Sequence, residues 1–439
     1  MLLLIELNEI NFDQIRAYSA LGLLPNLTGL INEHGLSETT SEDNYEELEP
    51  WIQWVTAHTG KPLAAHGIYR LGDIVDHDLD QIWEVLERQG VRVGAISPMN
   101  ASNRCTDPAF FVPDPWTRTR VSGAVGLKRL YAPISQIVND NAAGRMTAGS
   151  ALALVGGLMQ YARPANYLGY LGNLWNCVGK RSWHKAMLLD RLLADVFVKQ
   201  VAATRPGFAS LFLNAGAHIQ HHYLFNSRVY GGPLRNPEWY VGRDEDPVLD
   251  VYALYDRVVG DVRAAFPEAR VMLATGLHQD PHGSETFYWR LRDHAGFLKQ
   301  VEVPFERVEP RMSRDFILFC ADVKQARAAE RRLNAIVAED GRRLFAVDNR
   351  GDSLFVELIW AQDIPEDFCC RVDNQPIAGL RGDVAFVAVK NGQHNGIGYF
   401  LDTAHTPAQA KRFPLAELPA RVAAACSVEW SPERVPEAA

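Results

Sequence analysis

The chain has 439 residues, of which 47% are hydrophobic and 22% are charged, and its formal net charge is −9. These values are ordinary for a folded globular protein and exclude general disorder. The negative charge argues against a protein whose main task is to bind nucleic acid, because neutralising phosphates needs clustered Lys and Arg. A small anionic ligand is still compatible with this composition, since it needs only a local positive site.

The first hundred residues predict an alternation of buried strands and short helices. Residues 2–7 form an apolar run broken by one Glu, which is typical of a strand that is buried on both faces. Helices are expected at 11–18, 27–33 and 81–89, and a second strand is expected at 91–96. Strand, helix and strand in this order predict right-handed βαβ units and a mostly parallel sheet.

The next stretch, residues 103–205, has a different character. It contains several prolines and an aromatic segment at 161–183, and we expect a helical, aromatic-rich insertion or cap. Its large side chains are either buried core or a surface for a lipid or a protein partner, because exposed apolar patches mark contacts. Basic residues nearby keep a membrane-surface contact open. These residues are Arg163, Lys180, Arg181 and Lys185.

The α/β pattern returns after this insertion. The expected elements are strands at 210–214, 270–275, 384–389 and 398–401, and helices at 249–266 and 415–425. Residues 310–362 predict a small βαββ subdomain whose helix covers 324–338. The chain as a whole, residues 1–439, is therefore expected to form one three-layer α/β domain with a mostly parallel central sheet, the helical insertion and a small α+β subdomain.

The sequence contains no recognisable export or membrane signal. The N-terminal apolar run is too short for a signal peptide and lacks a basic leader. No apolar segment reaches the roughly 20 residues that a membrane span needs. A cytoplasmic location is therefore expected, and the oligomeric state is left open.

Several short motifs occur along the chain in a fixed order. The opening strand runs into Glu-Leu-Asn-Glu, and Leu-Pro-Asn-Leu and Thr-Gly…His-Gly-Ile follow it. Tyr-Asp precedes a later strand, and Gly-Gln-His-Asn-Gly-Ile lies near the C-terminus. These motifs begin at residues 6, 24, 59, 255 and 392. In this order they resemble the alkaline phosphatase superfamily, in particular its type I phosphodiesterase and nucleotide pyrophosphatase branch, and the resemblance implies a metal-dependent hydrolase of phosphate esters.

The positions of the family's reacting residues depart from that pattern. Where the family has an Asp ligand after its first strand, this chain has Asn8, and where it has a Thr or Ser nucleophile, this chain has Pro50. Ala217 stands in place of a second Asp ligand, whereas His221 and His394 match two His ligands. The resemblance therefore implies a weakened metal site and no alkoxide nucleophile.

The remaining polar residues suggest how a metal could still be held. His218, His221 and His222 follow a buried strand, and on a helix the spacings i, i+3 and i+4 share one face. Together with Asn8, His278 and His394, the residues His218 and His221 are the predicted ligands of a divalent metal such as zinc or manganese. The alternative is that these histidines line a polar pocket without metal.

An acidic run at 42–49 ends beside the missing nucleophile. Such a run is usually a solvated loop, but Glu49 is also placed to act as a base, as a nucleophile or as a ligand. Glu6 and Glu9 flank Asn8 and offer further carboxylate oxygens. We predict that Glu49 and His222 are the catalytic residues.

These residues and motifs are compatible with two functions. The first is a metal-assisted hydrolase or transferase that acts on a small anionic phospho- or sulfo-ester, with water activated by a His-bound metal and a Glu. The second is an inactive relative that binds a ligand or a protein partner through the pocket that corresponds to the family's active site.

Overall fold

The computed structural model describes residues 1–139, 148–177, 181–311, 314–373, 375–377 and 379–432. It consists of two compact units. The first unit comprises Met1–Pro281 and Gly392–Ala439, and the second comprises His282–Asn391. Each unit is described by itself.

The first unit is built around an eight-stranded sheet. Its strand order is β19-β2-β18-β6-β1-β5-β3-β4. The run from β6 to β4 is parallel, whereas β18 is antiparallel to both of its neighbours. The bounds are β1 (Leu2–Leu7), β2 (Ser37–Thr40), β3 (Val93–Ile96), β4 (Phe110–Val112), β5 (Phe208–Leu213), β6 (Arg270–Ala274), β18 (Ile397–Asp402) and β19 (Arg412–Pro414). The predicted mostly parallel central sheet is confirmed.

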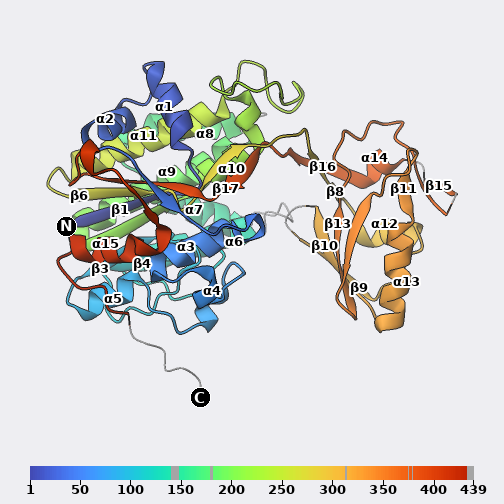
Figure 1. The fold of residues 1–439 in the computed structure, drawn as a ribbon, viewed down its shortest axis with the longest axis horizontal. Coiled ribbons are helices and arrows are strands. Elements are labelled where there is room, and N and C mark those ends of the chain that lie inside the picture. The colour runs from blue at the N-terminus through green and yellow to red at the C-terminus, as the bar shows by residue number, and fades with distance from the viewer. Residues whose placement is uncertain (140–147, 178–180, 312–313, 374, 378, 433–439) are drawn as a thin grey trace. The chain divides into compact units, whose positions relative to one another are not determined.

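The alternation of side chains along β1 divides the core into two layers. Leu3, Ile5 and Leu7 pack with the helices of one face, and Leu2 and Leu4 pack with the helices of the other. The first face carries α1 (Phe12–Ala20), α2 (Pro25–His34), α9 (His184–Thr204) and α11 (Pro247–Ala265). The second carries α3 (Pro50–Thr59), α5 (Ile82–Arg88) and α15 (Leu418–Ala425) (Figure 1). The predicted three-layer sandwich is therefore confirmed.

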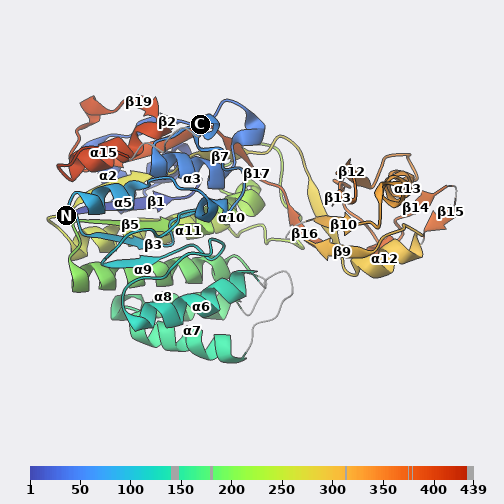
Figure 2. The same cartoon turned by 90° about the horizontal axis from the view of Figure 1, so that it is seen from below.

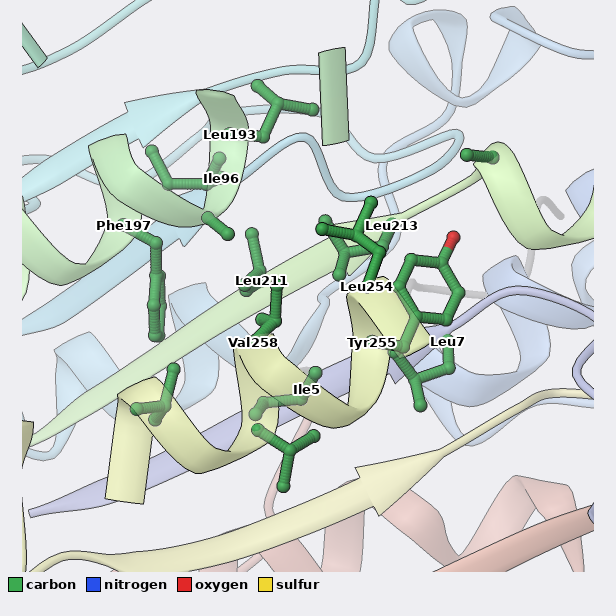
Figure 3. Packing of buried hydrophobic residues seen from close by; sticks show 14 of the residues in the cluster. Ile5, Leu7, Ile96, Leu193, Phe197, Leu211, Leu213, Leu254, Tyr255 and Val258 are labelled. Carbon is green, nitrogen blue, oxygen red and sulfur yellow. The ribbon is translucent and has the colours of Figure 1, made fainter. Parts of the chain in front are cut away.

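The first layer is filled by interdigitating aliphatic and aromatic side chains. Figure 3 shows Ile5 of β1 and Leu211 of β5 facing Phe197 of α9 and Val258 of α11. All four side chains are buried. Burial at this depth removes each of them from water and is worth about 1.5–3 kcal/mol per large side chain. The parallel strands are thus held rigidly, which fixes where their carboxyl ends lie.

Local sequence signals explain where these helices begin and end. The Asn11 side chain accepts hydrogen bonds from two backbone N–H groups of the first turn of α1, and Asp246 accepts one at the start of α11. Pro25 and Pro50 occupy the first positions of α2 and α3, where the missing N–H costs nothing. The predicted helices and strands of this unit end within two residues of the observed ones.

The segment 103–205 contains β4 and four helices. They are α6 (Val125–Asn139), α7 (Ala148–Tyr161), α8 (Tyr167–Cys177) and α9. In Figure 2, α6, α7 and α8 form an additional layer outside α9. Since β4 belongs to the central sheet and α9 packs on it, the added helical layer is α6–α8. The boundaries of the insertion stay a prediction.

The second unit is a small α+β assembly. It contains β8 (Phe287–Leu291), α12 (His294–Gln300), β9 (Arg307–Pro310), β10 (Asp315–Phe319), α13 (Val323–Asn334), β11 (Ile336–Ala338), β12 (Phe345–Asn349), β13 (Ser353–Leu358), β14 (Cys370–Val372), β15 (Gln375–Ile377), α14 (Leu380–Asp383) and β16 (Val384–Val389). Residues 336–338 were predicted as helix and are instead strand β11, because their backbone pairs with β14. Local apolar spacing does not reveal such a distant partner.

None of the helices in the described ranges has both the length and the apolar character that crossing a membrane requires.

Candidate metal centre

Three side-chain donors converge at the carboxyl end of the parallel strands. Glu9 Oε2 lies 3.2 Å from His221 Nε2 and 3.1 Å from His394 Nε2, and the two Nε2 atoms are 3.3 Å apart. An ion with tetrahedral ligands at 2.0–2.1 Å has its donors about 3.3–3.4 Å from one another. The three donors therefore have nearly the spacing that one metal ion needs. Within the described residues, they are the one group of His, Cys, Asp or Glu that converges in this way.

Glu9 owes its place to an unusual backbone conformation. It follows the end of β1 and has φ 60°, in the left-handed region that residues other than glycine seldom adopt. Its N–H donates to Thr275 O at 3.2 Å, and its carbonyl oxygen accepts from Gln220 Nε2 at 2.8 Å and from Gln279 N–H at 3.2 Å. These backbone contacts hold the strained residue, so that its carboxylate faces the two imidazoles.

His221 is delivered by α10 (Ala215–Tyr223), which directly follows β5. A buried carboxylate fixes the first turn of this helix. Asp190 Oδ2 accepts from Ala215 N–H at 2.8 Å and from the Tyr255 hydroxyl at 2.7 Å, and that hydroxyl accepts from Gly216 N–H at 2.8 Å. A Cβ at Gly216 would lie 2.3 Å from an Ile10 carbon, so the close packing requires glycine there. The start of α10 is thus locked to α9 and α11.

His394 lies on β17 (Gly392–Asn395), which pairs with β7 (His278–Pro281). In this register His394 is opposite Gln279, and Gln279 Nε2 donates both to Glu9 Oε2 and to Ala217 O. Gln279 therefore orients the carboxylate from the neighbouring strand. Hydrogen-bonded partners of this kind are known to tune the affinity of metal ligands.

His278 is not brought to this group. Neighbouring residues of a strand point to opposite faces, so Gln279 faces Glu9 and His278 faces away. The ring nitrogens of His278 are engaged by Ile397 O and by Asp280 Oδ1. The predicted ligand role of His278 would need one of these contacts to break and the ring to turn toward the group.

The charges of the group favour an ionised Glu9. Burial alone would raise the pKa of the Glu9 carboxyl, but the charges and hydrogen bonds of His394 and His221 hold that pKa far below its usual value. A carboxylate is the form in which Glu binds a metal ion.

His218 and His222 form a second pair on α10, beside the converging group. Their ring centroids are 4.7 Å apart, as expected for positions i and i+4 of a helix. Surrounding protein atoms lower the pKa of His218 to about 4, even though water still reaches its side chain, and they lower the pKa of His222 well below 6.5. Both imidazoles are therefore neutral at pH 7. Their predicted roles, a ligand for His218 and a catalytic residue for His222, stay predictions.

Asn8 lies directly behind Glu9. Its Oδ1 accepts from Trp54 Nε1 at 2.7 Å, and its amide group donates to Asn214 Oδ1 at 2.8 Å and to Glu9 Oε1 at 3.2 Å. The oxygen that was predicted to bind metal is therefore occupied by an indole N–H. In this structure Asn8 supports the carboxylate of Glu9.

Glu49 and Pro50 mark the start of α3. Glu49 precedes the helix and Pro50 is its first residue, buried and without an N–H. Glu49 Oε2 lies 4.0 Å from His394 Nδ1, on the side of that ring away from the converging group. Of the residues predicted from the sequence, the structure thus brings His221, His394 and Glu49 together. Glu9, which the sequence offered as a further source of carboxylate oxygens, joins them, and the structure adds Gln279.

Comparisons with known proteins give remote matches. No protein family profile matches the chain, and no curated protein matches it. Among solved structures, a phosphonoacetate hydrolase from Sinorhizobium meliloti 1021 in complex with phosphonoformate has a TM-score of 0.45 and 13% identity, covering 95% of this chain and 94% of that one. Murine ectonucleotide pyrophosphatase/phosphodiesterase 5 has a TM-score of 0.43 and 11% identity, covering 99% and 96%.

Proposed function

We propose that this protein is a metal-dependent hydrolase of a small phospho- or sulfo-ester and that Glu9, His221 and His394 hold one divalent cation. The observation that supports this proposal is the spacing of their three donor atoms, 3.1–3.3 Å from one another. Two imidazoles and one carboxylate are a ligand set that zinc uses in catalytic sites, where a fourth position stays open for water or substrate. Manganese and iron accept similar donors.

The ligand set also explains how the site tolerates Ala217. The family pattern that the sequence resembles has an Asp at that position, on the helix after β5. Here Glu9 supplies a carboxylate from the end of β1 instead, and Gln279 links the two places by donating to Glu9 Oε2 and to Ala217 O. One negative charge is thereby kept beside the two imidazoles, and this charge favours binding of a divalent cation.

A bound divalent cation would polarise an ester oxygen and make a neighbouring water a better nucleophile. Pro50 lies where the family has its nucleophilic hydroxyl, so in this proposal water attacks the ester directly and no covalent enzyme intermediate forms. Glu49, which lies 4.0 Å from His394 Nδ1, takes the proton of that water after its side chain rotates toward the ester. Asn8 and Gln279 hold Glu9 in the orientation in which it faces the imidazoles.

Pro50 also favours a second candidate function. A chain without the hydroxyl nucleophile, whose Asn8 oxygen is occupied by Trp54, could bind an anionic ligand without turning it over. In that case the pocket would bind a phosphorylated ligand, with or without metal, and no ester would be cleaved.

Metal analysis and an ester screen test the proposal together. We expect near-stoichiometric zinc, manganese or iron in the purified protein, and cleavage of bis(p-nitrophenyl) phosphate, p-nitrophenyl phosphate or p-nitrophenyl sulfate. The double substitution His221→Ala/His394→Ala should remove the metal and lower cleavage by about 10³-fold or more, because metal-ion charge stabilisation is worth several kcal/mol.

His218→Ala is the matched control, since this residue lies on the same helix but outside the converging group. It should retain the metal. Equal metal content in the double variant and the wild type would disprove the site, whereas bound metal without cleavage of any ester would favour the second function.

A further inference from the structure

The added helical layer has a face on which large apolar side chains are exposed to solvent. On α8, Leu168 and Trp175 are each 84% exposed and Leu171 is 63% exposed, and Met159 on α7 is 81% exposed. Val155 of α7 and Tyr167 of α8 are at least half exposed. We name these six residues the α7–α8 apolar face. So many large exposed side chains on two successive helices indicate a contact surface.

The spacing on α8 shows that this exposure belongs to one side of the helix. Leu168, Leu171 and Trp175 are three and four residues apart, which places them on one stripe. Tyr170 and Asn173 lie on the opposite side and are buried. The Tyr170 hydroxyl donates to Asp195 of α9 at 2.9 Å, so the inner side of α8 is firmly attached. The outer stripe therefore faces solvent in the folded protein.

Both helices also lack charged side chains. Neither Ala148–Tyr161 nor Tyr167–Cys177 contains Asp, Glu, Lys or Arg. Exposed helices of soluble proteins usually carry a charged outer face. A helix in the interfacial region of a bilayer combines an apolar side with Lys and Arg on its polar side, so here the neighbouring elements have to supply the positive charge.

The sequence around these helices is strongly basic. Residues 118–189 contain nine Lys and Arg and one Asp, in a chain whose net charge is −9. Lys128 and Arg129 of α6 and Lys185 of α9 are exposed members of this set. The positive charge is thus concentrated in the segment that presents the apolar face. An anionic surface would complement it, whereas a second copy of the same face would be repelled by like charge.

We propose that the α7–α8 apolar face binds the surface of a bilayer that contains anionic phospholipid. The apolar side chains enter the interfacial region, and the exposed Lys128, Arg129 and Lys185 contact the headgroups, whereas Arg163 and Arg181 pair with Asp261 and Glu245. With 14 and 11 residues, α7 and α8 are too short to cross the hydrocarbon core, so the attachment is peripheral. This proposal does not depend on the metal site.

Vesicle sedimentation of the full chain tests it. The wild type should sediment with vesicles of phosphatidylcholine and phosphatidylglycerol and should stay in solution with phosphatidylcholine alone. Binding should fall several-fold in 0.5 M NaCl, because salt screens the attraction to the headgroups. Leu168→Ser/Trp175→Ser should lower the partition coefficient by about tenfold or more, since two large apolar contacts are lost.

Leu21→Ser/Tyr69→Ser is the matched control, because these side chains are 58% and 60% exposed and lie outside the added layer. It should bind vesicles as the wild type does. The proposal is overturned if the wild type ignores anionic vesicles or if the Leu168/Trp175 variant binds them equally well. A concentration-dependent dimer that this variant abolishes, without vesicle binding by the wild type, would show instead that the face is a protein interface.

Discussion

The helices α10 and α3 both begin at the edge of the central sheet where the carboxyl ends of the parallel strands lie. They contribute different residues to the candidate metal site. The start of α10 is fixed by the buried Asp190, and this helix presents His221 to Glu9 and His394. The start of α3 has Pro50 in its first turn. Glu49, the residue before Pro50, has its Oε2 atom 4.0 Å from His394 Nδ1. The first helix therefore contributes one of the three converging donors, and the second contributes a carboxylate without a hydroxyl nucleophile.

Within the described residues, one group of donors converges, so this edge of the sheet offers ligands for one cation. Glu9 supplies the carboxylate of that group, and Asn8 supports Glu9 with a hydrogen bond. A chemistry that needs one cation and one base is what the two helix starts together can supply.

Replacing Glu49 tests the difference between the two helix starts most directly. If Glu49 is the base, Glu49→Gln should lower kcat by about 10²-fold or more, the usual range for a positioned general base, and leave the metal content unchanged. Steady-state kinetics and elemental analysis of the same preparation measure both quantities.

Glu46→Gln is the control for that experiment, because Glu46 belongs to the same acidic run and is exposed. Loss of metal from Glu49→Gln would mean that Glu49 orients His394 from its Nδ1 side. An unchanged kcat would mean that the start of α3 takes no part in the reaction.

The Asp190 carboxyl tests how the start of α10 is held. Burial raises the pKa of Asp190 from 3.8 to about 6, and the hydrogen bonds from Tyr255 and Ala215 offset part of that effect. The folded state therefore binds the Asp190 proton more tightly than the unfolded state does. Its contribution to stability is complete below about pH 4 and is lost as the pH rises through 6, by roughly 3 kcal/mol in total.

The measurement is the free energy of unfolding of the wild type and of Asp190→Asn at several pH values. The wild type should lose stability relative to the variant between about pH 4 and pH 7, because the variant cannot ionise at this position. Asp244→Asn, at an exposed position, serves as the control for removing a carboxylate. A constant difference for Asp190→Asn would contradict the raised pKa.

Much of the fold could be predicted because the relevant signals are local. A buried strand and its covering helices were predicted correctly from the apolar run 2–7, from the prolines that open helices and from the apolar spacing of 249–266. The strand 336–338 could not be predicted in this way, since its backbone pairs with residues 370–372, which lie more than 30 residues away in the chain.

The site was harder to predict because it depends on backbone conformation and on strand register. The alignment of motifs placed the ligand at Asn8. In the structure, the left-handed backbone of Glu9 directs the side chain of Glu9 itself toward the two imidazoles. A positive φ at a residue other than glycine leaves no mark in a sequence. Likewise, the pairing of β7 with β17 decides that Gln279, and not His278, faces Glu9. His221 and His394 were found because they match a motif residue by residue.

The smallest effect that we expect concerns Gln279, and it separates the predicted ligand His278 from its neighbour. Gln279→Ala should weaken metal binding by about 10–100-fold, the usual cost of removing a hydrogen-bonded partner of a ligand, while the fold is kept. His278→Gln should leave the metal affinity within about twofold, since the ring of His278 faces Ile397 and Asp280. Titration of the metal-free proteins with zinc measures both affinities. The reverse result would be a large loss of zinc affinity for His278→Gln and none for Gln279→Ala. It would mean that β7 presents its other face to the metal. The group of Glu9, His221 and His394 would then be incomplete without His278.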